Sequence, residues 1–270
     1  MQFVIGLFTF FFGAALGSFI GVIASRYNTG LPFLKGRSIC LSCNSKLGAN
    51  DLVPIFSFLS LGGRCRYCGD SIPKDSFFTE IIMGFLSVFA AYKSAFLIFP
   101  FSLANIAQYL LLVLIFSDIL LITAYDLKHF IIPDSFLVSL TLLSLVYNLL
   151  FIENYSLLLS LAYGIILSIP FLAIFVISRG KWLGFGDVKY IAVIGFLLGL
   201  SAGTTAVVIG FWAGAAVSLA ALLLGKLKSH VRLPYLGNNL TIKSEIPFGP
   251  FLSVGIILTL YFNVNLFQIF

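Results

Sequence analysis

Charged residues are scarce in this sequence of 270 residues: Asp, Glu, Lys and Arg make up 10% of it, and 60% of the residues are hydrophobic. An average soluble domain is about 25% charged and about 45–50% apolar. The mean hydropathy of +1.09 leaves too little polar surface to face water on all sides. The composition therefore excludes a soluble globular protein, a disordered protein and a DNA-binding domain.

Charge-free stretches define the candidate membrane spans. A bilayer core about 30 Å thick is crossed by about 20 apolar residues in a helix. The stretch 190–225 is too long for one crossing, and Gly199–Gly203 inside it is typical of a tight turn between two helices. We predict an all-α polytopic membrane protein with about eight transmembrane helices. Their approximate ranges are 3–25, 77–97, 103–125, 134–152, 155–177, 187–199, 202–224 and 249–268.

The first of these helices has the alternative of being a cleaved signal peptide. Its start is not basic, and residues 1–25 carry no charge. The apolar core of a signal peptide is only about 7–15 residues long. We therefore expect this segment to stay as a helix.

The positive charges test this helix count. With eight helices, one side of the membrane carries the segments 26–76, 126–133, 178–187 and 225–248. Together with Lys189 these segments hold 15 of the 16 Lys and Arg residues, and the other side holds only Lys93. Because Lys and Arg mark cytoplasmic loops, the net charge of +6 indicates topology and not nucleic-acid binding. The sequence thus predicts that this side is cytoplasmic and that both termini lie on the opposite side.

All four cysteines lie in the polar segment 26–76, as the pairs Cys40, Cys43 and Cys65, Cys68. Two CxxC pairs separated by about 15–20 residues are typical of a four-thiolate zinc site. The spacer of 21 residues here lengthens only the loop between the pairs. Each pair supplies two thiolates on one turn, and two turns close a tetrahedron about Zn²⁺. We predict a structural zinc site in a small zinc-ribbon-like cytoplasmic domain.

Two disulfides or a redox CxxC are the alternatives to zinc. The predicted topology places the cysteines in the cytoplasm, where thiols are kept reduced, and a redox pair needs no second CxxC. The predicted domains are therefore a first transmembrane helix at 1–25, a zinc-binding domain at 26–76 and a membrane domain at 77–270.

Most of the acidic residues lie within or at the edge of the apolar region, where ionisable groups are costly and usually functional. Six of the ten do so: Glu80, Asp118, Asp126, Asp134, Asp187 and Glu245. Asp126 ends the third predicted helix and Asp187 begins the sixth, so both lie at the same face of the membrane. Two carboxylates at one depth are what an aspartic dyad requires.

Such a dyad has a defined chemistry. Like charges a few ångströms apart cannot both ionise, so the pair holds one proton. The ionised partner takes a proton from water, and the protonated one donates to the scissile carbonyl. Gly184 and Gly186 leave the backbone bare beside Asp187, so an extended peptide can approach closely.

Helix capping is the simpler explanation for an aspartate at the membrane edge. It suits Asp134, which follows Pro133 and opens a helix, and it remains open for Asp187. It does not suit Asp126, because the dipole at a helix C-terminus disfavours an anion. An ion pathway or structural pairing of the acids is a further alternative.

Several motifs occur in a fixed order along nearly the whole chain. They are Gly13–Phe19 with Arg26, the CxxC pairs with Asp51–Pro54, Ser57 and Gly63–Gly69, then Glu80, Asp126 with Ile132–Asp134, Gly184–Asp187, and Ile246–Pro250. By these motifs the chain resembles the type IV prepilin peptidases, which are bifunctional leader peptidase/N-methyltransferases of the GxGD aspartic protease class. Gly21 departs from the pattern, because the family usually has Asn there.

The resemblance implies an enzyme of the bacterial inner membrane that cuts the short basic leader from prepilins and pseudopilins at the cytoplasmic face. It also implies methylation of the new N-terminal amine from S-adenosylmethionine. Asp126 and Asp187 would be catalytic, with Pro133, Asp134, Gly184 and Gly186 completing their motifs, and the four cysteines would support the cytoplasmic domain. The domain's presence favours methylation. No glycine-rich methyltransferase motif is visible, and Glu80 is the one weak candidate for the methyl-donor site.

Two rival functions remain open at this point. A proton-coupled transporter would use Asp118, Asp126 and Asp187 as a relay, and it predicts broken helices in matching halves of the chain, which the sequence does not show. A non-enzymatic assembly factor would use the zinc domain structurally, with basic loops on anionic lipid.

Overall fold

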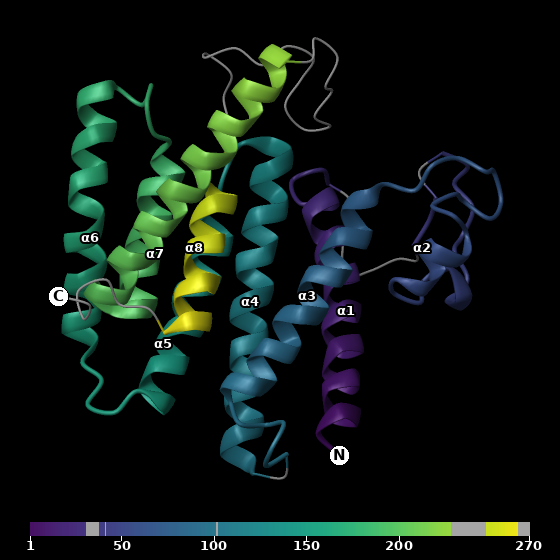
Figure 1. The fold of residues 1–270 in the computed structure, drawn as a ribbon, viewed down its shortest axis with the longest axis horizontal. Helices are drawn as coiled ribbons and strands as arrows, with labels where there is room; N and C mark the ends of the chain where they lie inside the picture. Colours follow the sequence, from purple (N-terminus) through teal and green to yellow (C-terminus); the bar gives the residue numbers. More distant parts are fainter. Residues whose placement is uncertain (31–37, 41, 101, 228–246, 264–270) are drawn as a thin grey trace. The chain divides into compact units, whose positions relative to one another are not determined.

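The computed structural model describes residues 1–30, 38–40, 42–100, 102–227 and 247–263. The chain divides into two compact units, Met1–Ala124 and Tyr125–Phe270. The described helices are α1 (Gln2–Arg26), η1 (Ala49–Asp51), α2 (Phe56–Ser60), α3 (Lys74–Lys93), α4 (Leu103–His129), α5 (Asp134–Phe151), α6 (Leu157–Ser178), α7 (Phe185–Leu227) and α8 (Gly249–Phe262). Figure 1 labels all of them except η1.

Six described helices are long and apolar enough to cross a membrane: α1, α3, α4, α5, α6 and the Phe185–Ala220 part of α7. The prediction of an all-helical fold is confirmed, and the eight predicted helices fit roughly. Gly199 divides α7 into the two predicted helices, and α8 is a shorter apolar helix of 14 residues. Predicted residues 264–268 lie outside the described part of the chain.

The break in α7 shows why Gly199 is a glycine. Its φ of 79° and ψ of 179° are not helical, and a side chain disfavours this conformation. Carbonyl groups freed near such a break need other donors in a water-poor surrounding. The buried side chain of Asn148 on α5 supplies them, because its Nδ2 donates to the Phe196 and Leu197 carbonyls at 3.2 and 3.4 Å.

In the first unit, α1 and α3 cross at small residues (Figure 1). A Cβ on Gly17 would lie 2.4 Å from the Thr79 carbonyl oxygen, and a Cβ on Gly13 would lie 2.4 Å from the Ser87 Cβ. In a lipid bilayer no hydrophobic force drives helices together. Small residues let two helix backbones approach closely, and this close packing holds the helices together. The glycines of the first predicted motif therefore have a packing role.

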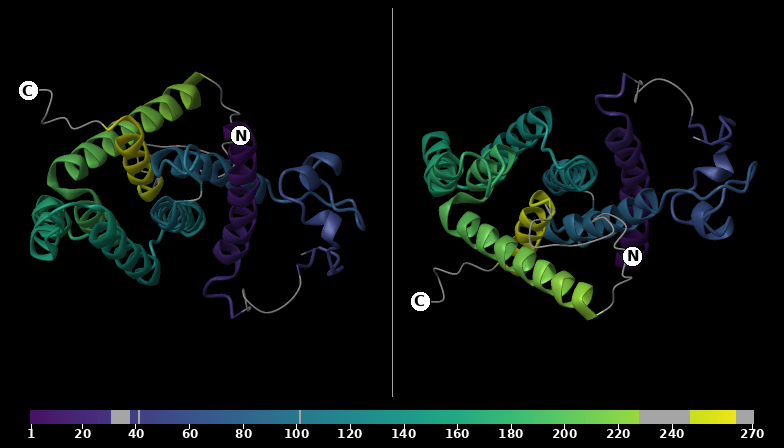
Figure 2. Two further views of the ribbon diagram at one scale, coloured as in Figure 1. Left: turned by 90° about the horizontal axis from the view of Figure 1, so that it is seen from below. Right: turned by 90° about the horizontal axis from the view of Figure 1, so that it is seen from above.

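In the second unit, close approach at glycines likewise joins α7 to both α6 and α8. A Cβ on Gly164 of α6 would lie 2.7 Å from the Ala192 carbonyl oxygen, and a Cβ on Gly255 of α8 would lie 2.0 Å from the Ala206 carbonyl oxygen. Figure 2 shows α8 in yellow against the light green second part of α7 in both views. Because these contacts involve backbone, α8 can take few other positions along α7.

Candidate active site and metal centre

Asp126 lies in the last turn of α4, inside the second unit. The helix runs four residues beyond the predicted end at 125, to His129. Phe130 stops it with a φ of 56°, and its N–H donates to the Asp126 carbonyl at 2.8 Å. The Asp126 side chain is buried, with 4% of its surface exposed. A buried carboxylate needs a partner that favours its charge.

That partner is the beginning of another helix. Gly249 is the first residue of α8, and its N–H donates to the Asp126 Oδ2 at 3.0 Å. The expectation that helix capping does not suit Asp126 is therefore wrong. Although Asp126 lies near the C-terminus of α4, its carboxylate lies at the N-terminus of α8, where backbone N–H groups and the dipole favour an anion.

Asp187 is the third residue of α7 and also faces a helix N-terminus. Its carboxylate accepts a hydrogen bond from the backbone N–H of Gly184, the residue before the helix. This is the reciprocal contact of a capping box. A Cβ on Gly184 would lie 3.1 Å from the Asp187 Oδ2, so a side chain there would crowd the carboxylate.

Ile132 connects the surroundings of the two aspartates. A Cβ on Gly186 would lie 3.2 Å from the Ile132 Cβ, and a Cβ on Gly249 would lie 3.3 Å from its Cδ1. The carboxylates of Asp126 and Asp187 are close enough for the charge of one to act on the other. The structure thus brings together two aspartates that are 61 residues apart in the sequence.

The predicted motif residues Pro133 and Asp134 connect α4 to α5. Pro133 is buried and stands at the N-cap, and Asp134 is exposed as the first residue of α5. The expectation that Asp134 caps this helix is wrong, because Pro133 occupies the N-cap and Asp134 lies in the first turn. Instead its carboxylate is paired with the Lys189 ammonium, two residues after Asp187. This ion pair joins the two aspartate motifs directly.

The four cysteines form a separate cluster in the first unit. Their sulfur atoms all lie within 4.8 Å of one another, and no disulfide joins them. The Sγ atoms of Cys40 and Cys68 are 3.8 Å apart. A tetrahedral zinc with bonds of about 2.3 Å places its sulfur ligands about 3.8 Å apart. The cluster therefore fits a four-thiolate metal site and not the disulfide alternative.

The two cysteine turns have the same backbone pattern. In the first, the Cys40 N–H donates to the Ser45 carbonyl and the Asn44 N–H donates to the Cys40 carbonyl. In the second, Cys65 makes the corresponding bonds with Asp70 and Gly69. Asn44 and Gly69 both have positive φ values, of 56° and 73°. Glycine adopts this conformation without steric cost, and Asn tolerates it.

Hydrogen bonds within these turns favour some thiolates over others. The backbone N–H groups of Cys43 and Ser42 lower the pKa of the Cys40 thiol to about 6. The Asp70 N–H also lowers that of Cys68, but desolvation and hydrogen bonds with the other three sulfurs outweigh it and raise the Cys68 pKa to about 12. Four thiolates this close need a cation to be ionised together.

The family models match both parts of the chain. The Bacterial Peptidase A24 N-terminal domain matches residues 11–94, which include the cysteines and Glu80. The Type IV leader peptidase family matches residues 111–219, which include Asp126 and Asp187.

Similar proteins include the prepilin leader peptidase/N-methyltransferases of Bacillus subtilis (strain 168) and Burkholderia pseudomallei (strain K96243), each 30% identical. The alignments cover 97% of this chain and 96% of the Bacillus protein, and 89% of this chain and 71% of the Burkholderia protein. The Aeromonas hydrophila protein of the same name is 27% identical over 87% of this chain and 73% of its own length. This chain belongs to the prepilin leader peptidase/N-methyltransferase family. No solved structure matches it.

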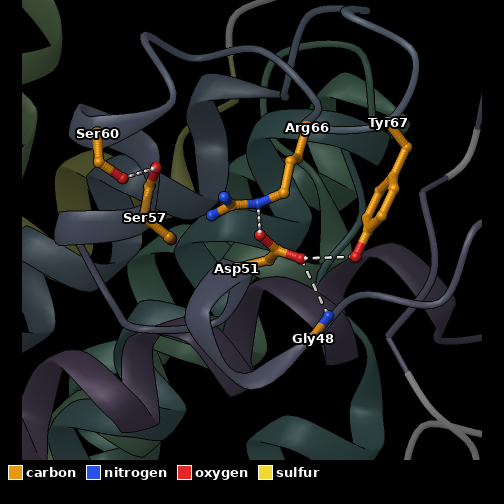
Figure 3. A network of polar contacts seen from close by, with 6 residues as sticks. All are labelled: Gly48, Asp51, Ser57, Ser60, Arg66 and Tyr67. Carbon is orange, nitrogen blue, oxygen red and sulfur yellow. Dashed lines mark hydrogen bonds and ion pairs between the residues drawn. The ribbon is translucent and has the colours of Figure 1, made fainter.

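The N-terminal family domain contains a polar network that the sequence did not reveal (Figure 3). Asp51 accepts from the Arg66 Nε at 2.6 Å, the Gly48 N–H at 3.0 Å and the Tyr67 hydroxyl at 3.3 Å. The hydrogen bond from Arg66, followed by that from Gly48, lowers the pKa of the Asp51 carboxyl. The network fixes the second cysteine turn to η1.

Glu80, on α3, connects this helix to the segment around Ile55 in the same domain. Its side chain is 7% exposed, and its carboxylate accepts the Ile55 N–H at 2.7 Å. Ile55 has φ 67° and ψ −53°, and the Phe56 N–H bonds back to the Pro54 carbonyl at 2.7 Å. This is a classic-type γ-turn, which is rare and strained for a β-branched residue. Glu80 thus pins a strained turn, and its role toward a methyl donor stays a prediction.

Proposed function

We propose that this chain cleaves the leader peptide of a prepilin or pseudopilin and then methylates the new N-terminal amine. The observation that carries the peptidase part is the meeting of Asp126 and Asp187 within the second unit, each at the N-terminus of a helix. Backbone N–H groups favour both carboxylates there, while their proximity disfavours two negative charges. Such a pair holds a single proton.

The proposed hydrolysis uses that proton in two stages. The ionised aspartate takes a proton from water as the water oxygen bonds to the scissile carbonyl carbon, and the other aspartate gives its proton to the carbonyl oxygen. The C–N bond then breaks as the first aspartate protonates the leaving nitrogen, and the second takes back a proton from the diol. The products are a carboxylic acid and a free amine, and the pair again holds one proton.

The glycines around the site suit a peptide substrate. Gly184, Gly186 and Gly249 each have neighbours that would meet a Cβ at 3.2 Å or less, so these positions admit almost no side chain. Gly184, beside Asp187, is exposed, so an extended strand of substrate can approach the backbone there, whereas Gly249 is buried against Asp126.

The cysteine cluster is proposed to hold a structural Zn²⁺. All four ligands come from the protein, and a closed four-sulfur site leaves no open position for catalysis. A cytoplasmic domain of about 50 residues has little core of its own, so metal binding stabilises its fold. The division into 1–25, 26–76 and 77–270 remains our proposal for the domain boundaries.

S-adenosylmethionine, when bound, supplies an electrophilic methyl group to the amine released by cleavage. The relatives' names include N-methyltransferase, and this supports the second activity. We assign no described residue to the methyl donor.

We also propose that the aspartates and the cysteine domain face the cytoplasm and that both termini lie on the other side of the bacterial inner membrane. The support is the distribution of Lys and Arg along the sequence. A prepilin could then keep its apolar segment among the helices, its basic leader in the cytoplasm and its cleavage point at the membrane edge.

The purified full-length protein, in detergent or liposomes, should cut a synthetic prepilin, and the product should gain a methyl group only when S-adenosylmethionine is present. Asp126→Asn and Asp187→Asn should each lower the cleavage rate about 10²–10⁴-fold. Glu153→Gln changes an exposed acid of the same unit and should have no effect. Full cleavage by either aspartate variant, or proton flux driven by a solute in place of cleavage, would refute the proposal.

A further inference from the structure

Two buried hydroxyl groups connect α7 to α8, one helical turn beyond Asp187 and Gly249. Tyr190 lies three residues after Asp187 and has no exposed surface, and its hydroxyl is 2.9 Å from the Oγ of Ser253. Ser253 is 2% exposed and donates to the Gly249 carbonyl at 3.0 Å. When the Ser253 hydroxyl donates to the Gly249 carbonyl, the Tyr190 O–H donates to the Ser253 oxygen.

The same Gly249 donates its N–H to Asp126 at 3.0 Å. A continuous series of hydrogen bonds therefore runs from Tyr190, one turn along α7 from Asp187, through Ser253 to the glycine that holds Asp126. A Cβ on Gly249 would lie 2.7 Å from the Asp126 Oδ2, so this peptide sits directly against the carboxylate. A small shift of α8 would change that contact.

Packing alone does not require these hydroxyls. Elsewhere between α7 and α8, Gly210 and Gly255 bring the two backbones together, because a Cβ on either would meet backbone atoms of the other helix at 2.9 Å or less. Burying a hydroxyl costs free energy unless it is hydrogen-bonded, whereas Phe and Ala would fill similar volumes. A satisfied buried network, in contrast, fixes one relative position of the two helices.

We propose that Tyr190 and Ser253 are positioning residues for the aspartate pair. They set the register of α8 against the first part of α7, so that the Gly249 N–H meets Asp126 while Asp187 is held at the start of α7. Neither hydroxyl touches the substrate. The inference rests on the proposed dyad, and it predicts effects on the catalytic step and not on substrate binding.

The test compares single-turnover and steady-state cleavage of a prepilin by the full-length protein. Tyr190→Phe and Ser253→Ala should each lower kcat about tenfold, with KM within about twofold of the unchanged protein, because a net hydrogen bond of this kind changes rates by roughly three- to tenfold. The double variant should be no slower than the singles, since both act through one network. Ser253→Thr keeps the hydroxyl and should restore most of kcat.

Ser144→Ala is the matched control. Ser144 is a fully buried serine of the same unit that donates to the carbonyl four residues earlier, at 2.6 Å, and it has no place in the network. Its kcat should be unchanged, and its melting temperature should fall as much as that of Ser253→Ala. If Tyr190→Phe does not accumulate, the comparison of Ser253→Ala with Ser253→Thr decides the matter.

An unchanged kcat in Ser253→Ala, equal losses in Ser253→Ala and Ser253→Thr, or losses that multiply in the double variant would overturn the positioning role. If instead Asp126→Asn and Asp187→Asn cleave normally, the dyad itself is wrong. The variants of Ser253 and Tyr190 therefore test the positioning role, and the variants of Asp126 and Asp187 test the dyad.

Discussion

The cysteine cluster and the aspartate pair are built in opposite ways. Each cysteine turn is closed by hydrogen bonds that span at most five residues, and the same pattern is used twice. The aspartates are brought together by contacts between helices, of which the bond from Gly249 to Asp126 spans 123 residues. The cysteine cluster depends on local turn geometry, and the aspartate pair depends on the close packing of glycines between helices. The two sites should therefore fail differently.

The largest effect is expected at the aspartate pair. Asp126→Asn and Asp187→Asn should each lower prepilin cleavage about 10²–10⁴-fold, and the double variant should be no slower than either, because the two groups act as one unit. Zinc content should not change, since the cysteines lie in the other unit. Cleavage assays with metal analysis on the same samples check both statements, and a double variant whose loss is the product of the single losses would speak against a shared proton.

Gly249→Ala tests the long-range packing itself. Gly249 has an ordinary helical φ, so its backbone accepts alanine, but the new Cβ would lie 2.7 Å from the Asp126 Oδ2. Displacing a catalytic group by about 1 Å can cost about 10²-fold in rate, and we expect a loss of that order in kcat. Gly6→Ala is the control, because nothing lies within 4 Å of a Cβ there. Equal activity of the two variants would show that the Gly249 contact does not matter.

The cysteine cluster could be predicted from the sequence more completely than the surroundings of the aspartate pair. The CxxC spacing predicts the metal cluster because all the geometry of a knuckle lies within about seven residues. The helix count and the distribution of Lys and Arg placed Asp126 and Asp187 at one membrane face, but neither can show that α8 begins against Asp126. That contact depends on glycine packing between α7 and α8, and a sequence pattern does not reveal which glycines meet.

Other polar contacts were missed for the same reason. Asn148 supports the break at Gly199 by binding the Phe196 carbonyl, 48 residues away in the sequence. The Asp134 carboxylate pairs with the Lys189 ammonium, a partner that its position after Pro133 does not indicate. Helix ends were predicted from charge, which marked α4 as ending at Asp126, although the helix continues to His129. Charge tells where a chain leaves lipid, not where its backbone hydrogen bonds stop.

Changing the metal ligands should separate the two regions. Cys65→Ser should lower the zinc content and abolish methylation, because a broken four-sulfur site cannot hold its domain. Cleavage should largely persist, since both aspartates belong to the second unit. Ser60→Ala, at an exposed position of the same segment, is the control. Full zinc content in Cys65→Ser, or cleavage lost together with methylation, would contradict this separation.

The smallest effect is expected at Asp51, which supports the second cysteine turn without binding metal. Its pKa in the folded protein is lowered, first by Arg66, so its ionised form stabilises the domain above the usual carboxyl pKa of 3.8. This contribution is lost as the pH falls through the lowered value. Asp51→Asn should therefore speed amide hydrogen exchange in residues 48–70 at neutral pH, relative to intrinsic rates. The difference from the unchanged protein should shrink in acid, and a difference that grew instead would reverse the assignment.

We propose that the carboxylates of Asp126 and Asp187 act together on one peptide carbonyl. Binding of a prepilin-derived peptide whose scissile amide is replaced by a hydroxyethylene group, which imitates the tetrahedral intermediate, measures this joint action. We predict tight binding to the unchanged protein and to Glu153→Gln, and binding at least about tenfold weaker to both Asp126→Asn and Asp187→Asn. Equal affinity for all four proteins would show that the two carboxylates do not act as a pair.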